Sequence, residues 1–192
     1  IPCNVAYTGL VGPPPPANPI STHEVIVSVG GGAVGARLLD AAARALATPD
    51  LRRLTALLLT GPNAPAGLAE ALGRLAPDAS VESFVDNMPD RLAGARLAVC
   101  QAGYNTAADL IVTGCPAVLV PFEGVGETEQ LRRAMALEAG GRAVVLREAS
   151  LAASSLAEAM GRALALPRSR SAKLDGAART AEILLAQLEL RP

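Results

Sequence analysis

Short apolar runs alternate with helical stretches along most of the chain. The runs expected to be buried strands are Val25–Val29, Leu54–Thr60, Ser80–Phe84, Leu97–Cys100, Ala117–Val120 and Ala143–Leu146. The segments with a helical pattern are Ala33–Ala47, Ala66–Leu75, Pro89–Ala95, Thr106–Thr113, Glu127–Ala139, Leu151–Leu164 and roughly Ala172–Leu188. This alternation predicts right-handed crossovers. We therefore expect an α/β fold with a doubly wound, mostly parallel six-stranded sheet and helices on both faces.

The beginning of the chain has a different pattern. A possible strand at Asn4–Thr8 is followed by GPPPPANP (Gly12–Pro19), whose four consecutive prolines favour a stiff polyproline II spacer. We interpret residues 1–20 as an interdomain strand and linker, and residues 21–192 as one binding domain. Because the sequence starts IPCNVAYTG without Met, we expect it to be part of a longer protein.

Composition narrows the classes of partner. The 192 residues are 51% hydrophobic and 18% charged, which is typical of one globular domain. A formal charge of −1 argues against nucleic acid, and the nearest basic cluster (Arg168, Arg170 and Lys173) is interpreted as a solvated loop. No signal-peptide pattern is visible in these residues, and no apolar run approaches the ~20 residues of a membrane span. Its three cysteines lack C-x-x-C spacing, so we expect reduced thiols and a cytoplasmic location.

The loop after the first strand is rich in glycine. In VIVSVGGGAVGARLLD, Gly30, Gly32 and Gly35 have G-x-G-x-x-G spacing between a strand and a helix. Missing side chains let backbone N–H groups approach a phosphate, and a helix N-terminus adds partial positive charge. A merely tight turn is the alternative.

A dinucleotide site also needs an acid at the end of the second strand to hold a ribose diol. That strand ends LLLTGPNAP, without a carboxylate, which disfavours a nicotinamide cofactor. Asp109 is the candidate acid elsewhere. It lies three residues after Thr106, so one interpretation is a capping box at a helix start, and the other is ribose binding beside the N–H groups of Gly103–Thr106. The two roles are compatible.

Two further strand ends carry candidate binding residues. Glu129 and Gln130 lie in the first turn of the helix after the fifth strand, and a carboxylate beside an amide suits sugar hydroxyls. An ordinary charged helix start is the alternative. SFVDNMPDRL places Phe84 and Val85 at the end of the third strand, where a flat base could lie. With one histidine and scattered cysteines no zinc site is expected, and no D-x-D pair is present.

Four segments together resemble a known family. VSVGGGAVG, VESFVDNM, CQAGYNTAADLIVTGCPAVLVPF and ETEQLRRAMALEAGG are similar to the C-terminal, donor-binding domain of GT-B glycosyltransferases of family 28. This family includes the MurG-like enzymes. The GYNT and EQ motifs resemble most those of bacterial predicted glycosyltransferases of the same family. The similarity covers about Val25–Glu148. It implies the Rossmann-like half of a GT-B fold.

The resemblance implies a set of donor-binding residues. They are Gly30, Gly31, Gly32, Val85, Met88, Gly103, Tyr104, Asn105, Thr106, Asp109, Glu129 and Gln130. The first three would face the donor diphosphate, and the Val85 main chain would meet uracil with Met88 nearby. Gly103 to Thr106 would line the diphosphate and ribose. Asp109 would hold the ribose diol where the family usually has Glu, and Glu129 and Gln130 would bind the transferred sugar.

These residues lead to one functional hypothesis and several rivals. We expect the donor-binding half of a transferase that moves a sugar from a nucleoside diphosphate, UDP above all, to an acceptor hydroxyl, without metal or other cofactor. The catalytic base and any membrane contact would belong to an N-terminal acceptor domain or a partner subunit, so this chain alone would be inactive. Asp109 has a shorter reach than Glu, and YTGLVGPP lacks the Arg that MurG-like enzymes carry near the end of the linker strand. The rivals are a nucleotide-sugar 2-epimerase, a non-catalytic nucleotide-sugar-binding subunit and, third, an NAD-dependent enzyme.

Overall fold

A computed structural model of the protein describes residues 5–30, 35–124, 126–169 and 174–189. Within them, six parallel strands form a sheet in the order β3-β2-β1-β4-β5-β6. The strands are β1 (Val25–Ser28), β2 (Ala56–Leu59), β3 (Ser80–Glu82), β4 (Leu97–Cys100), β5 (Ala117–Leu119) and β6 (Ala143–Val145). The expected doubly wound parallel sheet is therefore confirmed.

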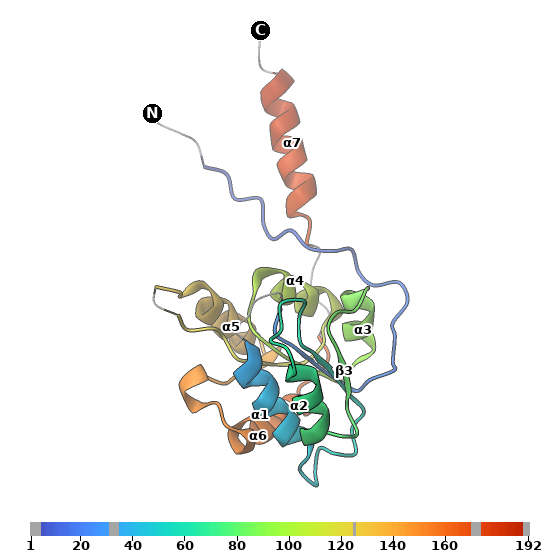
Figure 1. Ribbon diagram of the computed structural model, residues 1–192. Coiled ribbons are helices and arrows are strands. Elements are labelled where there is room, and N and C mark those ends of the chain that lie inside the picture. The colour runs from blue at the N-terminus through green and yellow to red at the C-terminus, as the bar shows by residue number, and fades with distance from the viewer. Residues whose placement is uncertain (1–4, 31–34, 125, 170–173, 190–192) are drawn as a thin grey trace.

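Helices cover both faces of the sheet (Figure 1). On one face lie α1 (Ala36–Leu46), α2 (Leu68–Leu75) and α6 (Ala153–Leu164), and on the other α3 (Met88–Gly94), α4 (Tyr104–Thr113) and α5 (Glu129–Ala139). A short 3-10 turn, η2 (Glu148–Ser150), precedes α6. The last helix, α7 (Gly176–Glu189), projects away from these layers.

The central strands are almost wholly apolar because both faces of the sheet are buried there, whereas the edge strand β3 carries the exposed Ser80 and Glu82. Successive strand side chains point to opposite faces, so Val25 and Val27 pack with the α1 and α6 layer. Ile26, between them, packs with the α3, α4 and α5 layer. This alternation produces two hydrophobic cores, one on each side of the sheet.

The N-terminal segment does not form the expected strand. Asn4 lies outside the described residues, and residues 5–8 are not in a strand. The side chains of Val5 and Tyr7 are 70% and 91% exposed, so nothing buries a strand here. The segment instead pairs with the chain entering α7, where Val11 and Asp175 form an isolated antiparallel bridge. The two segments that leave the domain therefore run side by side (Figure 1).

Helix α7 has few contacts with the rest of the described chain. Its large apolar side chains are exposed: Ile183 by 40%, Leu184 by 59%, Leu185 by 60% and Leu188 by 63%. None of the helices in the described ranges combines the length and the apolar character needed to cross a membrane.

Arg168 corrects one expectation drawn from composition. It is not simply solvated, because its guanidinium donates hydrogen bonds to the carbonyl oxygens of Leu92, Ala95 and Thr113. These carbonyls lie around the C-terminal ends of α3 and α4, where helices leave such groups without intrahelical partners. Arg170 and Lys173 lie outside the described residues.

The close packing of α1 on β1 has a measurable consequence. Gly35 is buried at the N-cap of α1, and a Cβ atom there would lie 2.1 Å from the Val29 Cβ. We expect Gly35→Ala to lower the free energy of unfolding by about 1–3 kcal/mol, because overpacking forces the backbone apart. Denaturant unfolding measures this.

Gly73 provides the matched control. It lies inside α2 with no heavy atom within 4 Å of a Cβ placed there. Gly73→Ala should leave stability unchanged or raise it by ~0.5–1 kcal/mol. Adding Val29→Ala to Gly35→Ala should restore part of the loss. Equal effects of the two glycine substitutions would contradict this account of the α1 packing.

Candidate functional site

The strand order reverses between β1 and β4. From β1 the sheet continues to β2 and β3 in one direction, and from β4 to β5 and β6 in the other. The helices that follow β1 and β4 leave to opposite faces, so a crevice opens beyond the carboxyl ends of these two strands. Ligands of doubly wound sheets bind in such a crevice.

A pocket of about 280 Å³ lies at this point. Its lining residues come from the carboxyl ends of four strands and from two helices on one face: Ser28, Gly30, Leu59, Gly61, Pro62, Ser83, Phe84, Val85, Met88, Leu92, Ala98, Cys100, Thr106 and Asp109. Most of these lining residues are apolar, and Asp109 is the one carboxylic acid among them. A largely apolar pocket with a few converging polar groups is typical of a small-molecule site.

The glycine-rich loop borders this pocket. Gly30 lines it, with φ +68° and no heavy atom within 4 Å of a Cβ placed there. This left-handed backbone favours glycine and keeps the pocket edge open. Gly31 and Gly32, which the sequence implies as phosphate contacts, lie outside the described residues.

The start of α4 differs from the sequence prediction. The helix begins at Tyr104 with Gly103 as N-cap, and no side chain caps it. Gly103 accepts the first helical bond, from the N–H of Ala107 at 2.9 Å. Thr106 is therefore inside the helix, and the predicted capping box of Thr106 and Asp109 is wrong. A glycine N-cap carries no side-chain signal, whereas Thr106 is of a residue type favoured at that position.

Asp109 faces the pocket from the inner side of α4. It lies one turn after Thr106, so the two side chains share a face of the helix. Burial raises the pKa of the Asp109 carboxyl to about 6, whereas a carboxylate at a helix N-terminus would have a lowered pKa. Within the described part of the chain, no Lys, Arg or His forms an ion pair with it. It is a half-buried acid whose charged form lacks a cationic partner.

Cys100 lies against the same pocket and stays neutral. Burial raises the pKa of its thiol far above the usual range, and the nearby Cys115 and Asp109 raise it further. Cys100 and Cys115 are both buried and free. Neither thiol has the exposure or low pKa of a nucleophile.

Tyr104 and Asn105 begin α4 but do not line the pocket. The Tyr104 hydroxyl accepts a hydrogen bond of 2.9 Å from the Val11 N–H. The Arg133 guanidinium lies 5.8 Å from the centre of the tyrosine ring and donates to the Ala102 carbonyl. Tyr104 therefore joins the N-terminal segment to the start of α4.

Glu129 and Gln130 lie apart from the pocket, in the first turn of α5. Because β5 neighbours β4, they are at the same edge of the sheet. The Glu129 side chain is 83% exposed and lies 3.7 Å from Arg133. The Gln130 side-chain oxygen accepts a hydrogen bond from the Phe122 N–H at 3.1 Å.

The end of β3 supplies an apolar wall. Val85 is buried and Met88 half-buried, while the Phe84 ring is 67% exposed at the pocket. Leu59, Gly61 and Pro62 at the end of β2 also line the pocket, although the sequence does not mark them as binding residues. The available signal was position, since every residue just beyond a parallel strand reaches this edge.

Metal ligands do not converge in the described ranges. No group of three or more His, Cys, Asp or Glu side chains there could hold a metal ion.

Known proteins share the sequence pattern and the fold of this chain. Residues 26–187 match the sequence profile of the glycosyltransferase family 28 C-terminal domain. A UDP-N-acetylglucosamine–N-acetylmuramyl-(pentapeptide) pyrophosphoryl-undecaprenol N-acetylglucosamine transferase of Acidithiobacillus ferrooxidans is 34% identical over 154 residues, which cover 79% of this chain and 43% of that enzyme.

Two solved structures share the fold. The calicheamicin glycosyltransferase CalG4 has a TM-score of 0.66 at 22% identity, covering 94% of this chain and 47% of that one. The spinosyn rhamnosyltransferase SpnG, complexed with thymidine diphosphate, has a TM-score of 0.59 at 21% identity, covering 90% and 46%.

The chain spans about half the length of each of these proteins. At such low identity the two structures establish the fold alone, and the family follows from the profile that covers most of the chain. The resemblance inferred from the motifs is confirmed: this chain belongs to the glycosyltransferase family 28 C-terminal domain family.

Proposed function

We propose that this chain binds the nucleoside diphosphate part of a sugar donor, and that it serves as the donor half of a glycosyltransferase. The observation that carries the proposal is the Asp109 carboxyl, held without a cationic partner among the described residues in an apolar pocket at the β1–β4 reversal. A charged form that is poorly solvated in the free protein is ready to accept hydrogen bonds from ligand hydroxyls.

The pocket suits a nucleoside. A base would lie against Phe84, Val85 and Met88 and bond to main-chain groups, while the ribose would turn its hydroxyls toward Asp109. The polar lining is sparse, as expected where a flat ring supplies most of the contact area.

The diphosphate would lie between the starts of two helices. Both α1 and α4 begin just beyond the carboxyl ends of β1 and β4, which are neighbours. Their first N–H groups lack intrahelical acceptors, and both dipoles place positive charge at this edge. Gly30 opens the backbone beside them, with Gly31 and Gly32 as further candidates from the sequence.

The proposed reaction uses this charge arrangement. An acceptor hydroxyl attacks the anomeric carbon, the bond from that carbon to the diphosphate oxygen breaks, and the nucleoside diphosphate leaves with the bonding electrons. Helix dipoles and N–H groups would stabilise the charge on the leaving group without a metal ion. The base that takes the hydroxyl proton would belong to another domain or subunit.

The two buried, free cysteines, Cys100 and Cys115, support a reducing, cytoplasmic setting for this half of the enzyme.

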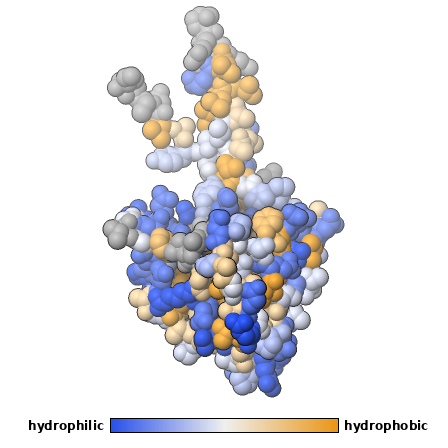
Figure 2. Space-filling model, viewed as in Figure 1, coloured by the Kyte–Doolittle hydropathy of each residue, from blue (hydrophilic) through white to orange (hydrophobic). Residues whose placement is uncertain are grey.

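A second half would pack beside α7. The surface formed by Ile183, Leu184, Leu185 and Leu188, here named the α7 apolar surface, is exposed next to the apolar N-terminal segment. Figure 2 shows both projecting from a mainly hydrophilic body. Because the relatives are about twice as long, we assign this surface to the acceptor half, supplied by the same chain or by a partner subunit.

The first experiment is calorimetric titration of UDP and its 2′-deoxy analogue, with GDP and dTDP as comparison. We expect Asp109→Ala to weaken UDP binding by about tenfold to a hundredfold, because two hydrogen bonds to a charged acceptor are lost. The loss should be smaller for the 2′-deoxy analogue, which offers one hydroxyl fewer.

Two further variants make this test specific. Asp109→Glu should retain most of the affinity, and Asp50→Ala, at an exposed position in the loop between α1 and β2, should have no effect. No binding of any nucleotide by the folded chain would refute the donor-binding proposal. Unchanged binding by Asp109→Ala would remove Asp109 from the site.

The affinity should also depend on pH. Only the ionised Asp109 carboxylate accepts two hydrogen bonds, and its pKa in the free protein is about 6. From pH 5 to pH 7.5 we expect about a tenfold gain in affinity, since below the pKa one proton must be released on binding. UDP-N-acetylglucosamine is the suitable ligand, because it lacks the terminal phosphate that itself titrates near pH 6.

Asp109→Asn is the control for this pH dependence of binding and should abolish it.

The stability of the unliganded chain should fall as the pH rises, whereas the affinity for the ligand should increase. The raised pKa means that the folded state binds the proton more tightly than the unfolded state, so this carboxyl lowers stability as pH rises from about 4 to 6. Asp109→Asn should thus add about 1 kcal/mol at pH 7.5 and nothing at pH 4. A variant that is less stable at pH 7.5 would contradict the desolvated state of Asp109.

The α7 apolar surface has its own test. Leu184→Lys combined with Leu188→Lys should leave nucleotide affinity unchanged, because α7 does not line the pocket. In the protein that also contains the acceptor half, the same double variant should lower sugar transfer by about tenfold or more, since charges would be buried at the interface between the halves. Unchanged transfer would contradict the assignment, as would a stable dimer of this chain that the double variant dissociates.

A further inference from the structure

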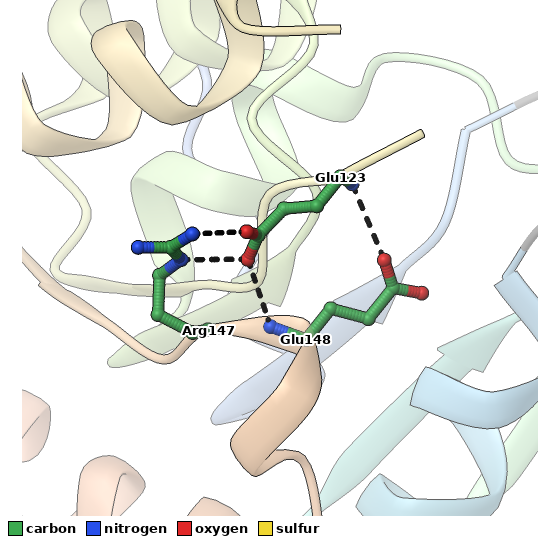
Figure 3. A network of polar contacts seen from close by, with 3 residues as sticks. All are labelled: Glu123, Arg147 and Glu148. Carbon is green, nitrogen blue, oxygen red and sulfur yellow. Dashed lines mark hydrogen bonds and ion pairs between the residues drawn. The ribbon is translucent and has the colours of Figure 1, made fainter. Parts of the chain in front are cut away.

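Three charged residues link the loop after β5 to the segment after β6. The Glu123 carboxylate accepts hydrogen bonds from Arg147 Nε at 2.7 Å, from Arg147 Nη2, and from the Glu148 N–H at 3.1 Å. The Glu148 carboxylate in turn accepts from the Glu123 N–H at 3.2 Å. Figure 3 shows these reciprocal contacts, which we name the Glu123 clamp (Glu123, Arg147 and Glu148).

The geometry of the Glu123 clamp indicates that it positions backbone segments more than it stabilises the fold. The Arg147 side chain is 55% exposed, and ion pairs so close to solvent add little to the free energy of unfolding. Its geometry, however, combines a two-pronged guanidinium–carboxylate contact with two side-chain to main-chain bonds in opposite directions. Such a set fixes both the distance and the orientation of two backbone segments.

The residue before the clamp touches the start of α5. The Phe122 N–H donates to Gln130 Oε1 at 3.1 Å, next to the Glu123 N–H that the clamp holds. The Glu127 carboxylate accepts hydrogen bonds from the N–H groups of Glu129 and Gln130, at 2.7 and 3.2 Å, and so caps the N-terminus of α5. The loop that carries the clamp therefore also sets the position of Gln130.

The contact with Phe122 determines which end of the Gln130 amide is free. A backbone N–H can only donate, so the atom that faces Phe122 must be the amide oxygen. The amide nitrogen, with two N–H groups, is then left to donate elsewhere. Gln130 lies at the carboxyl end of β5, the strand next to β4, so its amide can offer donors of fixed orientation at that edge of the sheet.

We propose that Glu123 and Arg147 are positioning residues for the transferred sugar. Through Phe122 they hold the Gln130 oxygen, so that its N–H groups donate to an oxygen of the sugar. The inference rests on the proposed donor-binding function, and it concerns the sugar part of the donor without the nucleoside or the diphosphate. The clamp therefore contributes to discrimination between a nucleotide sugar and the free nucleoside diphosphate.

The experiment compares dissociation constants for UDP and UDP-N-acetylglucosamine, and for dTDP and dTDP-glucose, by calorimetry. Arg147→Met and Glu123→Gln should weaken binding of the nucleotide sugar by about five- to tenfold and that of the free diphosphate by less than about twofold. Thermal unfolding of both variants should stay close to that of the unsubstituted chain.

A matched ion pair supplies the control. Arg96 and Glu24 form a 2.8 Å pair of similar exposure at the amino ends of β4 and β1, on the far edge of the sheet. Arg96→Met should change neither dissociation constant. A general effect of losing a surface ion pair would appear in this variant as well.

Gln130→Glu tests the route through Phe122. It keeps an oxygen for the Phe122 N–H but removes the amide donors, so it should reproduce the loss of sugar affinity. Combined with Arg147→Met it should cause little additional loss, because both changes remove the same interaction. Fully additive losses, or equal weakening of the nucleotide sugar and the free diphosphate, would overturn the positioning role. Failure of the unsubstituted chain to bind any free diphosphate would instead overturn the proposed function itself.

Discussion

The reversal of strand order between β1 and β4 determines where a pocket can form in this domain. Helices that follow these neighbouring strands pack on opposite faces, and a pocket opens at the edge between them. The same reversal puts the starts of α1 and α4 at one edge of the sheet, where Gly30 lines the pocket. The residues at this edge then give the pocket its chemical character, because most of its lining is apolar and Asp109 is its one carboxylic acid.

The site is maintained at a cost to the isolated domain. An acid half-buried without a cationic partner among the described residues is destabilising at neutral pH, and a well-packed apolar residue would suit the folded chain better. The segments around Asp109, in contrast, are held by specific hydrogen bonds. Tyr104 joins α4 to the N-terminal segment, and the Glu123 clamp holds the neighbouring loop. An energetically unfavourable group inside an ordered frame is a pattern expected of binding sites.

Much of the fold was predictable because it depends on burial. Leu57, Leu58 and Leu59 form a strand buried on both faces, so composition alone identifies it. The start of α4 was not predictable in this way, because Gly103 offers no capping side chain and Thr106 resembles a cap. The strand expected near Tyr7 failed because β-propensity without a neighbouring strand does not produce pairing. Asp109 was identified from the pattern of strand ends, but its desolvation depends on tertiary packing, which no local spacing encodes. The partners of Gln130, likewise, depend on contacts between segments distant in sequence.

The most direct measurement is a crystal structure of this chain with UDP. We expect the nucleotide in the pocket at the ends of β1 and β4, with its ribose hydroxyls within hydrogen-bond distance of the Asp109 carboxylate and its diphosphate at the starts of α1 and α4. A nucleotide bound elsewhere on the domain, or one in this pocket with its ribose turned away from Asp109, would contradict this expectation.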